Sequence, residues 1–201
     1  MVSIREFTAA DGPAIAEVRR ASWRAAYAGI IRQPLIDQAT ARASGLLQPA
    51  PWRRMLVAVP DGDPAVVGYA SFGPERSLLT FLPTSPPGSA PAATGQHPAA
   101  PRLTEAGLAG QVGEVYALYV APDWWSSGTG RSLMSRAVAA LSDAGYERAV
   151  LWVLEANARA RRFYERAGFT SDGATNVLDR LGGVTELRYR RAVNPQLYQP
   201  L

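Results

Sequence analysis

The stretch from Glu114 to Met134 constrains the fold of this chain more than any other. It begins as an apolar run that ends near Val120, passes Gly128 and Gly130, and continues with apolar residues at helical spacing. A strand, a glycine-containing turn and a helix in this order place free backbone N–H groups at the start of the helix. Because a helix N-terminus carries partial positive charge, the stretch predicts an anion-binding turn.

Two common phosphate-binding loops do not fit this turn. No Lys-Ser or Lys-Thr pair follows Gly130, as a Walker loop would require, and Leu133 stands where the dinucleotide fingerprint has its third glycine. A tight turn without a ligand uses the same residue types, so the glycines alone leave the ligand open. The candidate anion ligands are the backbone amides of Ser126, Ser127, Gly128, Thr129, Gly130 and Arg131.

The composition limits the chemistry that the chain can perform. The 201 residues, 47% of them apolar, are enough to bury the core of a single domain. Cysteine is absent, which excludes disulfides and thiol nucleophiles, and the single histidine, His97, excludes a site with several histidines, so we expect no metal. All 21 basic residues are arginine and are scattered among acids, so the net charge of +4 favours a small polyanionic ligand over nucleic acid.

Nothing in the sequence indicates a membrane or an export signal. No apolar run of about eighteen residues could span a membrane, and the N-terminal residues lack the basic and apolar segments of a secretory signal. We therefore expect a cytoplasmic protein without a membrane partner.

Periodicity predicts strands and helices along most of the chain. Alternating or short apolar runs predict strands, and apolar residues three and four apart predict helices. The predicted strands are 2–7, 55–59, 65–72, 111–120, 148–154, one that begins at Phe169, and 184–191; the predicted helices are about 11–29, a short one from Pro34, 128–144 and 158–167. This order predicts an α+β fold with a mixed sheet flanked by helices.

Two segments lack such periodicity. Residues 74–110 are rich in Pro, Ala, Ser, Gly and Thr, with too few apolar side chains to offset the entropy of ordering them. We expect a surface-loop insertion within one domain, and a lid over the substrate is the alternative. Residues 194–201 are expected to form a loose C-terminal tail.

A second motif follows the strand at 148–154 and gives the glycine turn a context. Its members are Asn157, Ala160, Phe163, Tyr164, Gly168 and Phe169. With the turn Trp125-Ser126-Ser127-Gly128-Thr129-Gly130, this segment resembles the Gcn5-related N-acetyltransferase (GNAT) superfamily, which transfers acetyl from acetyl-CoA to an amine. The resemblance covers residues 3–191 apart from the Pro/Ala-rich segment. It implies one N-acetyltransferase domain over 1–201, whose twisted, mostly antiparallel sheet of about six or seven strands splays at the cofactor site.

The resemblance also implies how the cofactor is held. Acetyl-CoA would be the cosubstrate, and its pyrophosphate would lie on the glycine turn. Its pantetheine arm would pair with the main chain of Leu118, Tyr119 and Val120, and Asn157 would hold the arm or the acceptor side through its amide. Tyr164 would donate a proton to the departing thiolate. A tyrosine packed between helix and sheet, with a satisfied hydroxyl, is the structural alternative.

The base and the acceptor pocket follow from the same resemblance. A histone-acetylating branch of the family has its base glutamate fourteen residues before the first motif glycine, and this position is Glu114. The alternatives are water as the base, and a strand-end carboxylate that is exposed or paired with arginine. Trp23 and Tyr27 would line the acceptor pocket or else belong to the core. The acceptor would be a small-molecule or peptide amine, and dimers are common in the family, so a homodimer is allowed.

Some positions depart from the family pattern. Trp125 replaces a glutamine or arginine and Ser126 replaces a glycine, so a cationic contact to the pyrophosphate is missing unless Arg131 supplies it. Trp152 stands where the branch that acetylates ribosomal-protein N-termini has a glutamate, which argues against that substrate. Trp125 also leaves open a second hypothesis, a CoA-binding regulatory module without catalysis. The arginines of the second motif are most simply a solvated helix face, and contact with nucleotide phosphates is the alternative: Arg159, Arg161 and Arg162.

Overall fold

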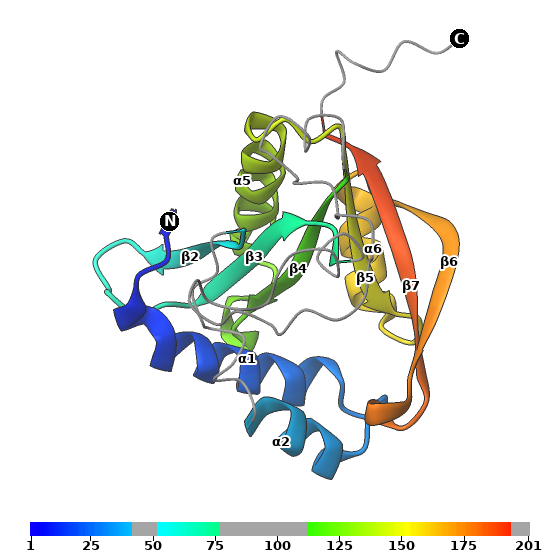
Figure 1. Ribbon diagram of the computed structural model, residues 1–201. Helices are drawn as coiled ribbons and strands as arrows, with labels where there is room; N and C mark the ends of the chain where they lie inside the picture. The colour runs from blue at the N-terminus through cyan, green and yellow to red at the C-terminus, as the bar shows by residue number, and fades with distance from the viewer. Residues whose placement is uncertain (42–51, 77–111, 194–201) are drawn as a thin grey trace, which may run out of the picture.

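A seven-stranded sheet organises the part of the chain that the computed structural model describes, residues 1–41, 52–76 and 112–193 (Figure 1). The strands are β1 Val2–Glu6, β2 Arg54–Pro60, β3 Gly68–Pro74, β4 Val112–Val120, β5 Arg148–Leu154, β6 Thr170–Leu178 and β7 Val184–Ala192. They lie in the order β1-β2-β3-β4-β5-β7-β6. All neighbours are antiparallel except β4 and β5, which are parallel. The predicted α+β class and mostly antiparallel sheet are confirmed.

Helices cover both faces of the sheet. They are α1 Gly12–Ala26, α2 Gln33–Ala41, α5 Thr129–Asp143 and α6 Ala158–Arg166, with short 3-10 turns η1 Ala9–Asp11, η3 Pro122–Trp124 and η4 Asp179–Leu181. Because side chains alternate along a strand, Leu56 of β2 packs in the cluster that contains α5, whereas Val57 packs in the cluster that contains α1. In Figure 1, α1 and α2 lie together below the sheet and α5 stands above it.

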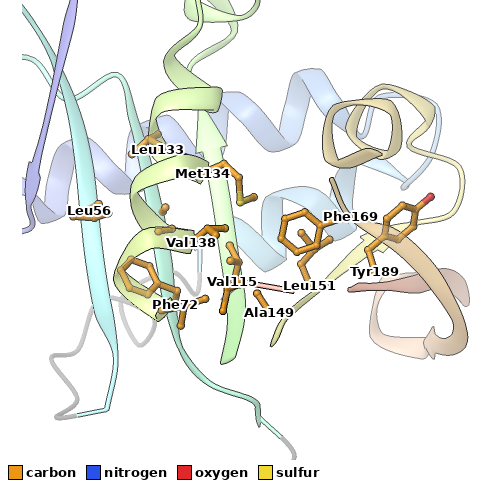
Figure 2. Packing of buried hydrophobic residues seen from close by; sticks show 14 of the residues in the cluster. Leu56, Phe72, Val115, Leu133, Met134, Val138, Ala149, Leu151, Phe169 and Tyr189 are labelled. Carbon is orange, nitrogen blue, oxygen red and sulfur yellow. The ribbon is translucent and has the colours of Figure 1, made fainter. Parts of the chain in front are cut away.

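The main core lies between α5, α6 and the sheet. Figure 2 shows Leu133, Met134 and Val138 of α5 pointing into side chains that come from both halves of the sheet. These partners include Phe72 and Val115 on one half, and Leu151, Phe169 and Tyr189 on the other. Burial of these apolar side chains holds the two halves together at about 25 cal/mol for each Å² removed from water.

The sheet opens at its centre. β4 and β5 pair at only three positions, Val112 with Arg148, Gly113 with Ala149, and Glu114 with Val150. Beyond Glu114 both strands continue unpaired with each other, β4 to Val120 and β5 to Leu154. The register between β3 and β4 also shifts between Ser71 and Phe72, so that Tyr116 has no residue opposite it. A bulge of this kind bends its strand, and here it lies just past the last paired position.

The structure corrects several boundaries predicted from the sequence. The strand expected at 65–72 begins at Gly68 and runs to Pro74, so the expected 74–110 loop starts later. Residues 77–111, with His97, and the expected tail 194–201 lie outside the described residues. The carboxylate of Asp11, the N-cap residue of α1, makes no side-chain capping contact and instead accepts charge-assisted hydrogen bonds from Arg5, at 2.7 and 2.8 Å. Among the helices of the described ranges, none is long and apolar enough to cross a membrane.

Candidate active site

A cleft of about 730 Å³ opens where β4 and β5 separate. Its walls are β4, β5, α6, the end of α1 and the turn at 124–131, and we call it the turn cleft. The structure brings most of the predicted site residues to its walls: Tyr27, Leu118, Tyr119, Val120, Ser126, Gly128, Gly130, Arg131, Asn157 and Tyr164. Four predicted site residues are not on these walls: Trp23, Glu114, Ser127 and Thr129.

The turn before α5 has the geometry of an anion site. Gly128 precedes the first residue of α5 with a φ of 93°, and an added Cβ would meet no atom within 4 Å. The backbone at this point is therefore open to a ligand, next to the free N–H groups of the helix. Ser126, which replaces the glycine of the family pattern, also has a left-handed φ, of 65°. The shared conformation explains why a glycine is usual there.

Ser127 and Thr129 support the turn from inside. The Ser127 hydroxyl donates to the Trp124 carbonyl at 2.7 Å and lies 2.8 Å from the Thr129 hydroxyl, which is buried. These contacts fix the loop in the conformation that exposes its amides. The Thr129 backbone N–H also donates to the Ser127 hydroxyl, at 3.3 Å, so any role of these two residues in anion binding would come mainly from the Ser127 backbone N–H.

Trp125 supports a cation at the rim of the turn cleft. Its Nε1 donates to the carbonyl of Val120 at 2.7 Å, and the guanidinium of Arg159 lies over its ring, 3.8 Å from the centroid. Stacking on the indole face attracts a cation electrostatically and restricts its motion. Arg159 and Arg131 both line the cleft. The arginines of the second motif therefore do not all face the cleft. Arg161 instead donates a hydrogen bond to the Tyr189 hydroxyl, at 3.1 Å.

Asn157 begins α6 at the edge of the turn cleft. Its Oδ1 accepts a hydrogen bond from the backbone N–H of Ala160 at 3.1 Å, the contact of an N-cap. The side chain lines the cleft as well. This capping contact fixes the side chain near the end of β5 that no longer pairs with β4.

Tyr164 reaches the turn cleft from α6. Burial raises the pKa of its hydroxyl well above the ordinary value for tyrosine, and the nearby Tyr119 hydroxyl raises it further. No other described residue forms a hydrogen bond with the Tyr164 hydroxyl. Tyr164 is therefore a neutral phenol at physiological pH, with a proton available to a ligand in the cleft.

Tyr27 lies where the cleft meets a second hollow. Burial raises the pKa of its hydroxyl, and the neighbouring hydroxyls of Tyr119, Tyr164 and Tyr69 raise it further. Its ring packs edge-on against Trp23, with centroids 5.0 Å apart. Several aromatic side chains thus meet at the open end of the split.

Glu114 has a different environment from the one that a general base requires. Its carboxylate is fully buried and lines neither hollow. It accepts hydrogen bonds from the backbone N–H of Arg76 at 2.8 Å and from Arg76 Nε at 2.7 Å. A second guanidinium nitrogen of Arg76 lies 2.6 Å away. Glu114 is therefore a carboxylate paired with arginine, which is one of the alternatives that the sequence left open.

The second hollow, of about 530 Å³, lies between α1, α2, β3, β4 and β7. We call it the arginine pocket, because four arginines line it: Arg19, Arg53, Arg76 and Arg180. Trp23 lies on its wall and not in the turn cleft. The two hollows meet at the split and share these residues: Tyr27, Tyr116, Ala117, Tyr119, Trp152 and Leu154. The two hollows are therefore adjacent at the split.

Sequence reasoning missed the arginines of this pocket. Arg19 and Trp23 of α1 and Tyr27, its C-cap residue, follow one another at intervals of four residues, and this spacing places them on one helix face. That spacing was a usable signal for Arg19. Arg76 gave no local signal, since its partner Glu114 is 38 residues away in the chain.

Sequence comparisons agree with this arrangement. A profile of the acetyltransferase (GNAT) family matches residues 15–169. A probable N-acetyltransferase of Mycobacterium tuberculosis is 27% identical over 190 residues, 91% of this chain and 88% of the relative. A mycothiol acetyltransferase of Thermobispora bispora is 42% identical over 64 residues, 32% of this chain and 22% of the relative. The chain thus aligns with about a fifth of the length of this mycothiol acetyltransferase.

Solved structures share the fold along nearly the whole chain. A GNAT-family protein of Desulfovibrio desulfuricans matches with a TM-score of 0.61 at 23% identity, over 96% of this chain and 100% of the other. An N-acetyltransferase of Thermoplasma acidophilum, solved with coenzyme A, matches with a TM-score of 0.61 at 17% identity, over 94% and 98%. A Salmonella typhimurium protein solved with acetyl-CoA matches with a TM-score of 0.58 at 21% identity, over 100% and 98%.

Proposed function

The chain belongs to the acetyltransferase (GNAT) family, and on this premise we propose that it transfers the acetyl group of acetyl-CoA to the primary amine of a small-molecule or peptide acceptor. One observation carries the proposal. Two hollows meet at the split between β4 and β5, one beside an anion-binding turn and the other lined by aromatic and cationic side chains. The geometry suits a reaction between two molecules bound at once.

Coenzyme A fits the turn cleft by its chemistry. The pyrophosphate would accept hydrogen bonds from the amides at the start of α5, where the backbone at Gly128 is open. Arg159 on Trp125, together with Arg131, supplies positive charge beside the turn. The pantetheine amides would pair with the free edge of β4 at Leu118–Val120. The family usually has a glutamine or arginine at position 125. Here Trp125 would instead hold the guanidinium of Arg159 beside the pyrophosphate.

The transfer itself is direct attack. The amine nitrogen forms a bond to the thioester carbon, the C–S bond breaks, and the electron pair leaves with sulfur. Backbone N–H groups near Val120 would polarise the thioester carbonyl. Tyr164, which keeps its proton because burial raises its pKa, donates that proton to the thiolate, and the proton that the acylated nitrogen loses returns through water to Tyr164. No acyl-enzyme is required, and the chain has no cysteine to form a thioester.

Water is the proposed base. The oxygens of Glu114 are occupied by Arg76, and Glu114 reaches neither hollow. Glu114 then acts by positioning Arg76 on the wall of the arginine pocket. The acceptor amine loses its proton to solvent in that pocket before it attacks. The short segments shared with mycothiol acetyltransferases support the acetyl transfer, and they do not extend to a particular acceptor.

The composition of the chain allows a clean test. The protein has no cysteine and no lysine, so a thiol reagent detects only released coenzyme A, and no lysine side chain of the enzyme can serve as an acceptor. The assay measures thiol release from acetyl-CoA across a panel of amines, with an amine-free reaction as the control. We expect amine-dependent release with at least one acceptor. Thermal stabilisation by coenzyme A without release on any amine would favour a binding module and refute the proposal.

A further inference from the structure

The guanidinium of Arg19 is buried without a counter-ion. The residue is 8% exposed, its Nη1 has no hydrogen-bond partner, and no carboxylate of the described residues pairs with it. The guanidinium lies over the ring of Trp23, 4.9 Å from the guanidinium carbon to the centroid. Trp23 Nε1 is also buried, and no described residue accepts a hydrogen bond from it. A buried charge and a buried donor that nothing satisfies are costly, so both are expected to meet a ligand.

Other arginines on the wall of the arginine pocket add to the positive charge around Arg19. Arg53, Arg76 and Arg180 line the same pocket as Arg19. Glu114 neutralises Arg76. Glu186 is the one carboxylate on the described wall, and it already accepts a hydrogen bond from Asn176 at 2.9 Å. An anion that enters the pocket therefore meets more positive than negative charge.

We propose that the arginine pocket binds an acceptor that carries a carboxylate as well as the reactive amine, with the carboxylate bound by Arg19 and by Trp23 Nε1. The assignment rests on the proposed acetyl transfer and names the class of acceptor. A planar carboxylate matches the forked donors of a guanidinium, which favours this anion.

The geometry of α1 orients such an acceptor. The guanidinium of Arg19 lies over Trp23, and the Trp23 ring contacts Tyr27, which belongs to both hollows. Tyr27 lies four residues after Trp23 and eight after Arg19, so a carboxylate held by these two residues and an amine at the Tyr27 junction are between one and two helix turns apart, or roughly 6–12 Å. Aromatic side chains line the path between them, including Trp152 and Tyr116. An aromatic or apolar spacer of this length suits the pocket.

The test compares two acceptors that differ only in charge. The probes are 4-(aminomethyl)benzoate and its carboxamide, and the readout is kcat/KM for thiol release from acetyl-CoA. For the wild-type protein we expect kcat/KM to be at least about tenfold higher for the acid, as for a charge-assisted hydrogen bond. Arg19→Gln should reduce this ratio to about one, mainly by lowering kcat/KM for the acid.

Matched variants separate recognition from folding. Arg20 lies on the same helix as Arg19, but it is exposed and pairs with Glu17. The control variant Arg20→Gln should therefore keep the wild-type ratio of kcat/KM for the acid to kcat/KM for the carboxamide. Trp23→Phe keeps a ring for packing but removes Nε1, and it should lower the ratio by a smaller factor. Arg19→Gln should not lower the melting temperature of the unliganded protein, because it removes a buried charge that lacks a partner.

Binding without turnover distinguishes this inference from the proposed function. With coenzyme A present, the acid should raise the melting temperature of the wild-type protein and not of Arg19→Gln. Equal kcat/KM for the two probes, or an unchanged ratio in Arg19→Gln, would overturn the inference and leave acetyl transfer standing. Acid-specific stabilisation that requires Arg19, without turnover on any amine, would support the site and refute the transferase proposal.

Discussion

Replacing Glu114 by glutamine tests whether this carboxylate supports structure or catalysis. Its side chain is 1% exposed, and three nitrogens of Arg76 lie within 2.8 Å of its oxygens. Glutamine keeps the shape, but it removes the charge and turns one accepting oxygen into a donor that faces other donors. Removing one partner of a buried ion pair costs about 3–5 kcal/mol. Because Arg76 is 54% exposed and can be hydrated, we expect less than this, about 2–3 kcal/mol.

Thermal and chemical unfolding measure this loss. For a domain of this size, about 2–3 kcal/mol lowers the melting temperature by roughly 4–12 °C. Glu17→Gln is the control, since Glu17 is exposed and should change stability by less than about 0.5 kcal/mol. At temperatures where Glu114→Gln is folded, kcat should stay within a few-fold. The limb on which activity rises with pH should also keep its midpoint.

The opposite pair of results would refute this reasoning. An unchanged melting temperature, together with a collapse of kcat and loss of the rising pH limb, would make Glu114 the general base. A rise in KM for the acceptor with kcat preserved would fit the positioning role, because Arg76 lies on the wall of the arginine pocket.

Three further predictions follow from the site and from the first strand. Tyr164→Phe should lower kcat about ten- to a hundredfold without changing the Kd for coenzyme A, since only a proton donor is lost; an unchanged kcat would remove it from the mechanism. Gly128→Ala places a Cβ in the open turn and should raise the Kd for coenzyme A at least about tenfold by calorimetry, whereas Gly62→Ala, with the same left-handed strain in a distant turn, should not. Hydrogen bonds from Arg5 hold the pKa of Asp11 well below its usual range, so the stability they contribute is full above about pH 4 and is lost as pH falls through the depressed folded pKa. Asp11→Asn should therefore flatten the fall in melting temperature below about pH 4, and an unchanged acid profile would show that this pair contributes nothing.

Local patterns predicted the elements of the fold, because they depend on near neighbours. The apolar run at 148–154 is the whole of β5, and the motif from Asn157 places α6 and its N-cap where the structure has them. The turn at Gly128 was predictable for the same reason, since glycine reports a backbone conformation directly.

The arginine pocket could not be predicted in this way. Its walls come from segments far apart in the chain, and Arg76 reaches it only through the contact with Glu114. The role of Trp125 was also hidden, because it depends on Arg159 of a different helix folding over the ring. The sequence suggested a lost contact to the cofactor. The structure shows a ring that supports a cation.

The split between β4 and β5 gives the two proposed ligands different kinds of surface. The cofactor side offers mainly backbone, the free edge of β4 and the amides before α5, whereas the acceptor side offers side chains. Backbone groups are the same in every residue except proline, but a side-chain contact changes with each substitution. Mutations on the wall of the arginine pocket can therefore exchange one acceptor for another while the cofactor stays bound. The fold thus keeps the proposed cofactor contacts apart from the side chains that would select the acceptor.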